Sequence, residues 1–168
     1  VRLATELGMG ITVWSPLASG LLAGRYRRDA APEGRLAQMK DNGNPAFQHL
    51  NERNWRIVDE LQSVADELGR PMAQVALNWV AHRPGVASVI VGASRPEQLQ
   101  HNLGALDFEL PAELAQRLSH ASEVPPPFPY YFFTDAMQGM LYGGASVGDK
   151  PAGYRAPVLV RGSGAGVS

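Results

Sequence analysis

Apolar residues recur at spacings of three and four between Glu52 and Leu68, and this periodicity predicts a helix. Asn51 precedes the helix as a suitable N-cap, because its side-chain oxygen can accept a hydrogen bond from a free backbone N–H. Gly69 follows as a residue that can adopt the left-handed conformation common at helix ends. The apolar stripe of this helix consists of Val58, Leu61, Val64, Ala65 and Leu68.

Further helices are predicted from their start signals. Pro71 opens one of them, because proline is favoured in the first turn, where its missing N–H costs nothing. Ser94 and Glu97 have the spacing of a capping box, in which each side chain bonds the backbone N–H of the other residue. This pair predicts a helix over Arg95–Leu103. The other predicted helical segments are residues 2–7 and 111–121.

Two short runs rich in β-branched residues predict strands, at residues 11–14 and 86–91. In the second run Val89, Ile90 and Val91 are consecutive apolar residues, which is typical of a parallel strand buried on both faces. Strands that alternate with helices indicate a parallel α/β sheet or barrel. Because two strands do not make a stable sheet, we expect the missing strands outside this sequence. The open sheet edges predict self-association.

Two segments show no such periodicity. Residues 27–51 are polar and contain glycine and proline, so we expect a long surface loop. From residue 130 the chain begins with four aromatic residues and ends in a glycine-rich stretch. We therefore predict a globular unit over residues 1–129 and a partly disordered C-terminal arm over residues 130–168. The aromatic run either lines a pocket or packs within the arm.

The chain has 168 residues, with 15 Lys and Arg against 16 Asp and Glu, and so lacks the positive charge of a non-specific nucleic-acid binder. It has no cysteine, which excludes disulfides, thiolate metal sites and a cysteine nucleophile, and fits a reducing cytoplasm. The uncharged residues 7–23 include Pro16 and several glycines, so we expect a strand and loop there rather than a membrane span. The start at Val1 rather than Met suggests a chain that begins within a longer protein.

Two segments have the residues of an anion-binding site, and each follows a predicted strand. The first comprises residues 14–25. Gly20 and Gly24 allow the backbone to approach a ligand closely, and Arg25 supplies positive charge. A plain glycine-containing turn is the alternative for this segment.

The second segment, residues 92–102, runs from a strand into the start of a helix. A helix N-terminus offers free N–H groups and the positive end of its dipole, and Ser94 and Arg95 add side-chain donors. A helix cap without a ligand is the alternative here. Ligands of α/β folds collect at the carboxyl ends of the strands, where both segments are expected. Taken together, the two segments favour a dinucleotide.

These motifs resemble the C-terminal portion of an aldo-keto reductase. The resemblance is carried by Trp14-Ser-Pro-Leu-Ala-x-Gly-Leu-Leu-x-Gly-Arg-Tyr26, Pro71-x-x-Gln74-Val-Ala-Leu-x-Trp79, Pro84-Gly-Val86 and Ile90-Val-Gly-Ala-Ser-Arg-Pro-Glu-Gln-Leu-x-x-Asn102. It covers about residues 1–129 and relates the chain to the bacterial branch that also resembles potassium-channel β subunits. It implies the C-terminal part of a TIM-type (β/α)8 barrel, incomplete with about two strands plus helices, that binds NADPH without a Rossmann domain.

The resemblance also implies which residues hold the cofactor. Trp14 would stack on the nicotinamide ring, with core packing as the alternative for this side chain. Around the pyrophosphate the family pattern places Ser15, Leu17 and Gly20, with Arg25 nearby, and Arg35 in the long loop that closes over the cofactor. Around the adenosine 2′-phosphate it places Gly92, Ser94, Arg95 and Gln98, with Asn102 at the adenine.

The sequence departs from the family in its proton-transfer residues. Aldo-keto reductases use an Asp, Tyr, Lys and His set, yet no Asp precedes a Tyr at the family's four-residue spacing here. Lys40 and Lys150 are the two lysines, and neither ends a predicted strand. The histidines are expected on the surface, at positions 49, 82, 101 and 120. We therefore predict no catalytic residues and no metal site in this chain.

Three functional hypotheses follow. In the first, the full-length protein reduces aldehydes or ketones with NADPH, and this chain, which lacks the proton donor, is inactive alone. In the second, the chain is a regulatory NADPH-sensing module like the channel β subunits. In the third, it is an inactive truncated gene product. The expected partners are a small carbonyl substrate in the full-length protein and further copies of the chain, without nucleic acid or membrane.

Overall fold

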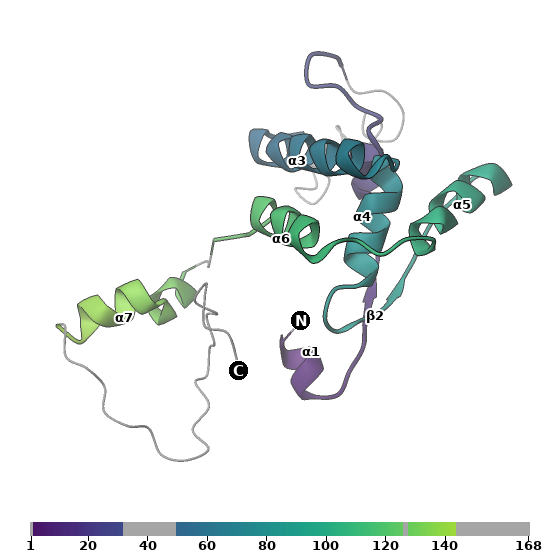
Figure 1. The fold of residues 1–168 in the computed structure, drawn as a ribbon. Helices are drawn as coiled ribbons and strands as arrows, with labels where there is room; N and C mark the ends of the chain where they lie inside the picture. Colours follow the sequence, from purple (N-terminus) through teal and green to yellow (C-terminus); the bar gives the residue numbers. More distant parts are fainter. Residues whose placement is uncertain (1, 32–49, 126–127, 144–168) are drawn as a thin grey trace. The chain divides into compact units, whose positions relative to one another are not determined.

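A computed structural model describes residues 2–31, 50–125 and 128–143. The predicted long loop, with Arg35, and the glycine-rich end of the arm therefore lie mostly outside the described residues. The chain forms two compact units, Val1–Ser122 and Glu123–Ser168. Elements of the first unit are α1 (Arg2–Glu6), β1 (Ile11–Val13), the 3-10 segment η1 (Ala18–Ala23), α3 (Glu52–Leu68), α4 (Met72–Ala81), β2 (Val86–Val89), α5 (Pro96–Leu103), η3 (Gly104–Leu106) and α6 (Ala112–Ala121) (Figure 1).

The two predicted strands pair side by side and parallel, as expected from the alternation of strands and helices. Ile11 is opposite Val86 and Val13 is opposite Val89, with an irregularity in the register after Ile11. Parallel pairing brings the carboxyl ends of β1 and β2 to the same edge of the sheet. This arrangement is that of a partial α/β barrel or sheet.

The prediction that the second strand is buried on both faces is wrong for the described part of the chain. Ala87 and Ser88 are exposed, and Ile90, just after β2, is 50% exposed. Successive side chains of a strand point to opposite faces, so exposure of both residues means that the described residues cover neither face of β2 completely, although α4 packs against it. The two-stranded sheet thus presents an open surface.

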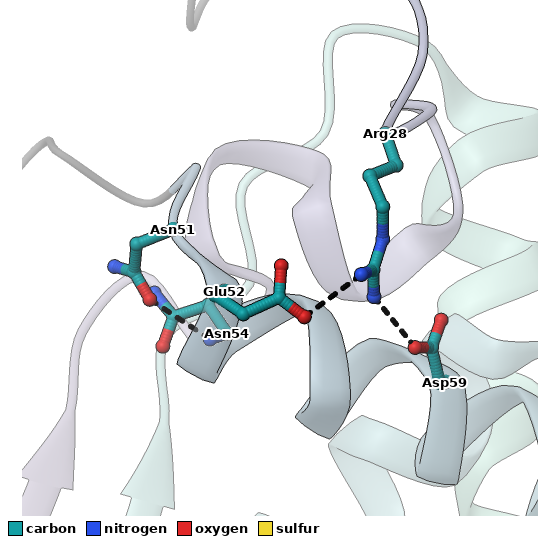
Figure 2. A network of polar contacts seen from close by, with 5 residues as sticks. All are labelled: Arg28, Asn51, Glu52, Asn54 and Asp59. Atoms are coloured by element: carbon teal, nitrogen blue, oxygen red, sulfur yellow. Dashed lines mark hydrogen bonds and ion pairs between the residues drawn. The ribbon is translucent and has the colours of Figure 1, made fainter.

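Helix α3 begins and ends where the sequence predicts, and polar contacts fix its start (Figure 2). The Asn51 side chain accepts a hydrogen bond from the backbone N–H of Asn54 at 2.9 Å. Arg28, from the chain after η1, donates to Glu52 and to Asp59, at 2.8 Å each. Arg28 therefore ties the chain that follows η1 to the first turns of α3.

The core of the first unit forms where α3, α4, α6 and η1 meet. The predicted apolar stripe of α3 faces this core, with Val64 fully buried and Leu68 partly buried against it. Leu21 of η1 is 2% exposed. The core side chains are Leu21, Val58, Leu61, Val64, Ala65, Met72, Val75, Ala76, Leu114 and Leu118. Burial of this apolar surface is the main stabilising contribution to the unit.

Helix α4 is buried over most of its length and contacts α3, η1, β2, α5 and η3. Two of its buried residues are amides. The Nδ2 of Asn78 donates to the carbonyls of Ala105 and Phe108, at 2.9 and 2.8 Å. The Nε2 of Gln74 donates to the carbonyl of His101 at 2.7 Å. These bonds fasten the segment from α5 through η3 to α4.

Helix α6 is held on α3 by one arginine as well as by its apolar face. Arg117 donates to Glu60 at 2.8 Å, to Glu67 at 2.7 Å and to the hydroxyl of Ser63 at 3.1 Å. The hydrogen bonds to Glu67 and then Glu60 raise the pKa of Arg117 above its ordinary value, so its guanidinium stays charged. All partners lie on α3, which makes Arg117 the polar part of the α3–α6 contact.

The capping-box prediction for α5 is wrong in its detail. The N-cap is Arg95 rather than Ser94, and Pro96 occupies the first helical position. Because the residue before a proline is restricted to extended conformations, Arg95 adopts φ −143° and ψ 146° and the helix cannot begin earlier. The side chain that bonds the backbone N–H of Ser94 is Gln98, at 3.1 Å, and not Glu97.

The second unit contains η4 (Tyr130–Phe133) and α7 (Asp135–Leu141), which contact each other. Two residues of the aromatic run cluster with Phe128 within this unit. The rings of Tyr131 and Phe132 stack with centroids 4.3 Å apart, and both contact Phe128. Among the described residues, no helix is both long and apolar enough to cross a bilayer.

We expect Asn78→Leu to lower the free energy of unfolding by about 2–4 kcal/mol, measured by urea denaturation. Leucine has a similar size, but it leaves the buried carbonyl of Ala105 and the partly buried carbonyl of Phe108 without their donor, each at a cost of roughly 1–3 kcal/mol. Removal of the unpartnered Oδ1 of Asn78 offsets a part of this cost. Gln62→Leu is the control, because Gln62 is an exposed amide of α3, and should change stability by less than about 0.5 kcal/mol. Equal stability of the two variants would contradict the role given to Asn78.

Candidate functional site

A cleft of about 740 Å³ lies at the carboxyl ends of β1 and β2. This volume falls within the range of about 300–1,000 Å³ that is usual for ligand sites. Nine of the predicted cofactor residues line the cleft: Trp14, Ser15, Leu17, Gly20, Arg25, Gly92, Ser94, Gln98 and Asn102. Arg95 is not among the lining residues, and Arg35 lies outside the described residues. The structure thus brings the two predicted segments to one cavity.

The first wall of the cleft is formed by residues 14–25, which follow β1 and whose backbone has an unusual conformation. Three residues other than glycine have positive φ: Ser15 at 55°, Ala18 at 47° and Ser19 at 58°. Each such residue costs about 1–2 kcal/mol relative to ordinary helical geometry, so the surrounding structure must stabilise this path. Strain of this kind is concentrated at functional sites.

Gly20 is required within this wall for two reasons. Its φ of 100° strongly favours glycine, and an added Cβ would lie 2.9 Å from the Cδ of Arg25. The aliphatic part of Arg25 therefore lies against the Gly20 backbone. The sequence predicted glycine at this position for close approach of a ligand, and the structure adds close approach of Arg25.

The second wall is formed by the turn after β2 and by α5. Ser94 and Gln98 both line the cleft and are hydrogen-bonded to each other. α5 begins at this wall, so the positive end of its dipole and its first N–H groups lie there. Asn102, one turn after Gln98, is buried and also lines the cleft. The polar residues of α5 at this wall thus follow helical spacing.

Trp14 extends the cleft beyond the end of β1. Its side chain is 66% exposed, so it does not pack in the core that the described residues form. An exposed indole that lines a cleft presents a flat apolar face to a ligand. The exposed Ile90 lines the same cleft from the end of β2.

Sequence reasoning missed several lining residues. His101, expected only on the surface, is exposed but lines the cleft. Its place on α5, three residues after Gln98, would have indicated this, because residues three apart share a helix face. Ser19 lines the first wall, and Met72 and Ala73 contribute the start of α4. The α4 residues carry no motif that could have revealed them.

The chemistry that the cleft offers a ligand follows from its polar groups. Its polar groups are a guanidinium, hydroxyls, amides, one imidazole and a helix N-terminus, which together suit phosphate and a nucleobase. No group of three or more His, Cys, Asp or Glu residues that could hold a metal ion occurs in the described part of the chain.

Comparison with known proteins identifies relatives of this chain. It is 44% identical over 105 residues to a probable voltage-gated potassium channel subunit beta of Arabidopsis thaliana, a match that covers 62% of this chain and 32% of the relative. It is 40% identical over 105 residues to the protein of the same description from Oryza sativa subsp. japonica, with the same coverage of each. The chain spans about a third of the length of these curated relatives.

A sequence profile of the Aldo/keto reductase family matches residues 1–123, which include both walls of the cleft and all of the elements that support them. The two parallel strands with their helices agree with a part of the barrel that this family forms. The chain belongs to the aldo/keto reductase family.

Proposed function

We propose that this chain is the NADPH-binding part of an oxidoreductase that, in full length, reduces aldehydes or ketones to alcohols. The observation that carries the proposal is the convergence of two strand-to-turn segments on one cleft. Aldo/keto reductases generally use NAD(P)H, and the polar groups of the cleft are suited to such a ligand.

The hydrogen-bond donors and the aromatic side chain of the cleft are suited to the phosphates and the two ring systems of a dinucleotide. Arg25 and the glycine-containing first wall offer a cation and accessible backbone to a pyrophosphate. The start of α5, with Ser94, offers N–H groups and a hydroxyl to a second phosphate. Arg95, as the N-cap of α5, is the nearest candidate in sequence for a charge on the 2′-phosphate. Asn102 and Trp14 would contact the two ring systems.

When bound, NADPH supplies hydride to the carbonyl carbon of a substrate. The residues of this chain bind and orient the cofactor: Trp14 stacks on a ring, and the two walls fix the charged end. Protonation of the carbonyl oxygen needs the family's Asp, Tyr, Lys and His set, which the sequence does not show in the family pattern. In this proposal the rest of the full-length protein binds the carbonyl substrate and donates its proton, and the protein acts in the cytoplasm.

A second candidate function is a regulatory module in which cofactor occupancy matters more than turnover. The observation that favours it is the similarity to two proteins described as probable voltage-gated potassium channel subunits beta. Tight NADPH binding together with a stable protein partner would favour this function. Carbonyl reduction by the full-length protein would favour the oxidoreductase.

The first prediction concerns cofactor choice. We expect the chain to bind NADPH more tightly than NADH in calorimetric titration. Arg95→Ala should weaken the affinity for NADPH by about tenfold and change the affinity for NADH by less than about twofold, because a charged hydrogen bond to phosphate contributes about 1.5–3 kcal/mol. Arg56→Ala is the control, since Arg56 is an exposed arginine of α3 and not a lining residue. Tighter binding of NADH would contradict the choice of NADPH.

The second prediction concerns turnover. The purified chain should show no NADPH-dependent reduction of aldehydes or ketones, followed by absorbance at the nicotinamide band, because positioned proton transfer contributes about 10²–10⁴-fold to such rates. The same assay on the chain with Trp14→Leu controls for contaminating reductases. Activity that this substitution abolishes would show that the chain carries its own proton donor.

The third prediction concerns association. We propose that the open sheet surface brings copies of the chain together, because unpaired strand edges and exposed apolar residues such as Ile90 favour contact. Light scattering after size exclusion should show oligomers that increase with concentration. Ile90→Lys should shift the population toward monomer, whereas Leu106→Lys, at an exposed leucine of η3, should not. A monomer at every concentration would rule out this association.

A further inference from the structure

The strained first wall of the cleft needs something to hold its shape, and one hydrogen bond is placed to do so. Ser19 and Gly20 both have positive φ, at 58° and 100°, and both line the cleft. The carbonyl of Ser19 and the N–H of Gly20 belong to the same peptide plane. Whatever fixes this plane fixes the backbone that a ligand would meet.

Both ends of this peptide plane are bonded. The hydroxyl of Tyr26 donates to the carbonyl oxygen of Ser19 at 3.1 Å. The N–H of Gly20 donates to the carbonyl of Leu17 at 2.9 Å. With a partner on each side, the plane cannot flip without loss of two hydrogen bonds. The bond from Tyr26 is the one that comes from a side chain and spans seven residues.

Tyr26 is itself fixed by its surroundings. Its ring is partly buried and packs against the core of the first unit. Before it, Leu21 is buried in the core, and Gly24 lies against Met72 of α4, where an added Cβ would be 3.1 Å from the sulfur. After it, Arg28 is bonded to two carboxylates of α3. Because these contacts fix the ring of Tyr26, its hydroxyl is in a constant position to donate to the Ser19 carbonyl.

Tyr26 is not among the residues that line the cleft, so any effect on a ligand must pass through Ser19 and Gly20. We propose that Tyr26 is a positioning residue whose hydroxyl keeps the Ser19–Gly20 peptide in the orientation required for binding the dinucleotide pyrophosphate. The binding part of this inference rests on the proposed function. The ring of Tyr26 packs against the core, and its hydroxyl holds the Ser19–Gly20 peptide in place.

Tyr26→Phe separates these two contributions, because it removes the hydroxyl and keeps the ring. In the full chain without ligand, we expect hydrogen exchange at the amides of Gly20 and Leu22 to accelerate about three- to tenfold. Both amides donate to the carbonyl of Leu17, and their protection depends on the shape of this wall. The midpoint of thermal unfolding should fall by no more than about 3 °C.

The same variant is then titrated with two ligands. We expect the dissociation constant for NADPH to rise about three- to tenfold, the size that loss of one hydrogen bond gives. The dissociation constant for adenosine 2′-monophosphate should not change, because this probe carries no pyrophosphate and would engage only the second wall. A residue with a merely structural role would weaken both ligands alike.

Two control variants accompany Tyr26→Phe. Tyr142→Phe removes a hydroxyl from an exposed tyrosine of the second unit and should leave exchange and affinity unchanged. Leu118→Ala removes a buried side chain from the α3–α6 contact and should lower the unfolding midpoint without selective loss of NADPH. The second control shows what general destabilisation does to the two ligands.

Each outcome has a distinct meaning. Faster exchange with selective loss of NADPH supports the proposal. Wild-type exchange and wild-type NADPH affinity in Tyr26→Phe would overturn it while the proposed function stands. Equal weakening of both ligands would also overturn it and assign the hydroxyl to general stability. If the wild-type chain binds neither ligand, the proposed function fails and the positioning of pyrophosphate fails with it, whatever the exchange shows.

Discussion

The buried side chain of Asn78 connects the elements on which the cleft depends. It lies in the middle of α4 with 0% exposure, and its two N–H donors are shared between Ala105 and Phe108. Gln74, one turn earlier on α4, bonds the end of α5 in the same way. The oxygens of these two amides, Asn78 Oδ1 and Gln74 Oε1, are buried without a partner, so the stabilisation comes from the N–H donors. A buried donor is costly unless it is bonded, so these bonds specify one placement of the α5–η3 segment relative to α4. Without that placement the second wall of the cleft has no fixed position.

The first wall of the cleft is also supported by α4, through contacts with the core and with the start of this helix. Leu21 inserts its side chain into the core, and Gly24 contacts Met72 at the start of α4. These contacts are favourable enough to stabilise a backbone with several left-handed residues, which would not persist in an isolated peptide. A strained wall that is fixed before the ligand arrives loses little freedom on binding, and such preorganisation favours affinity. One helix thus supports both sides of the site.

The groups that meet at the cleft are the basis for the part of the family's chemistry that we assign to this chain. The strands meet the cleft with their carboxyl ends, which is where ligands bind in α/β folds. The groups at this end are suited to the charged part of a dinucleotide, while the sheet beside them is open and apolar residues such as Trp14 and Ile90 are exposed. In the aldo/keto reductase family such a surface is part of a larger barrel. Binding and proton transfer are therefore assigned to different parts of the full-length protein in our proposal.

The sequence by itself determined the local elements and the family. The bounds of α3, the start of α4 directly after Pro71 and the left-handed cap at Gly69 follow from periodicity and from residues with restricted backbones, because these signals act within a few residues. The parallel pairing was expected from the alternation of strands and helices. The tertiary structure alone decided that Arg95 rather than Ser94 caps α5, that Ala87 and Ser88 of β2 are exposed, and that His101 and Met72 line the cleft. It also decided the bond from Tyr26 to Ser19, whose partners carry no joint signal in the sequence. Contacts between distant segments depend on how whole helices pack, and no short pattern of residues encodes that packing.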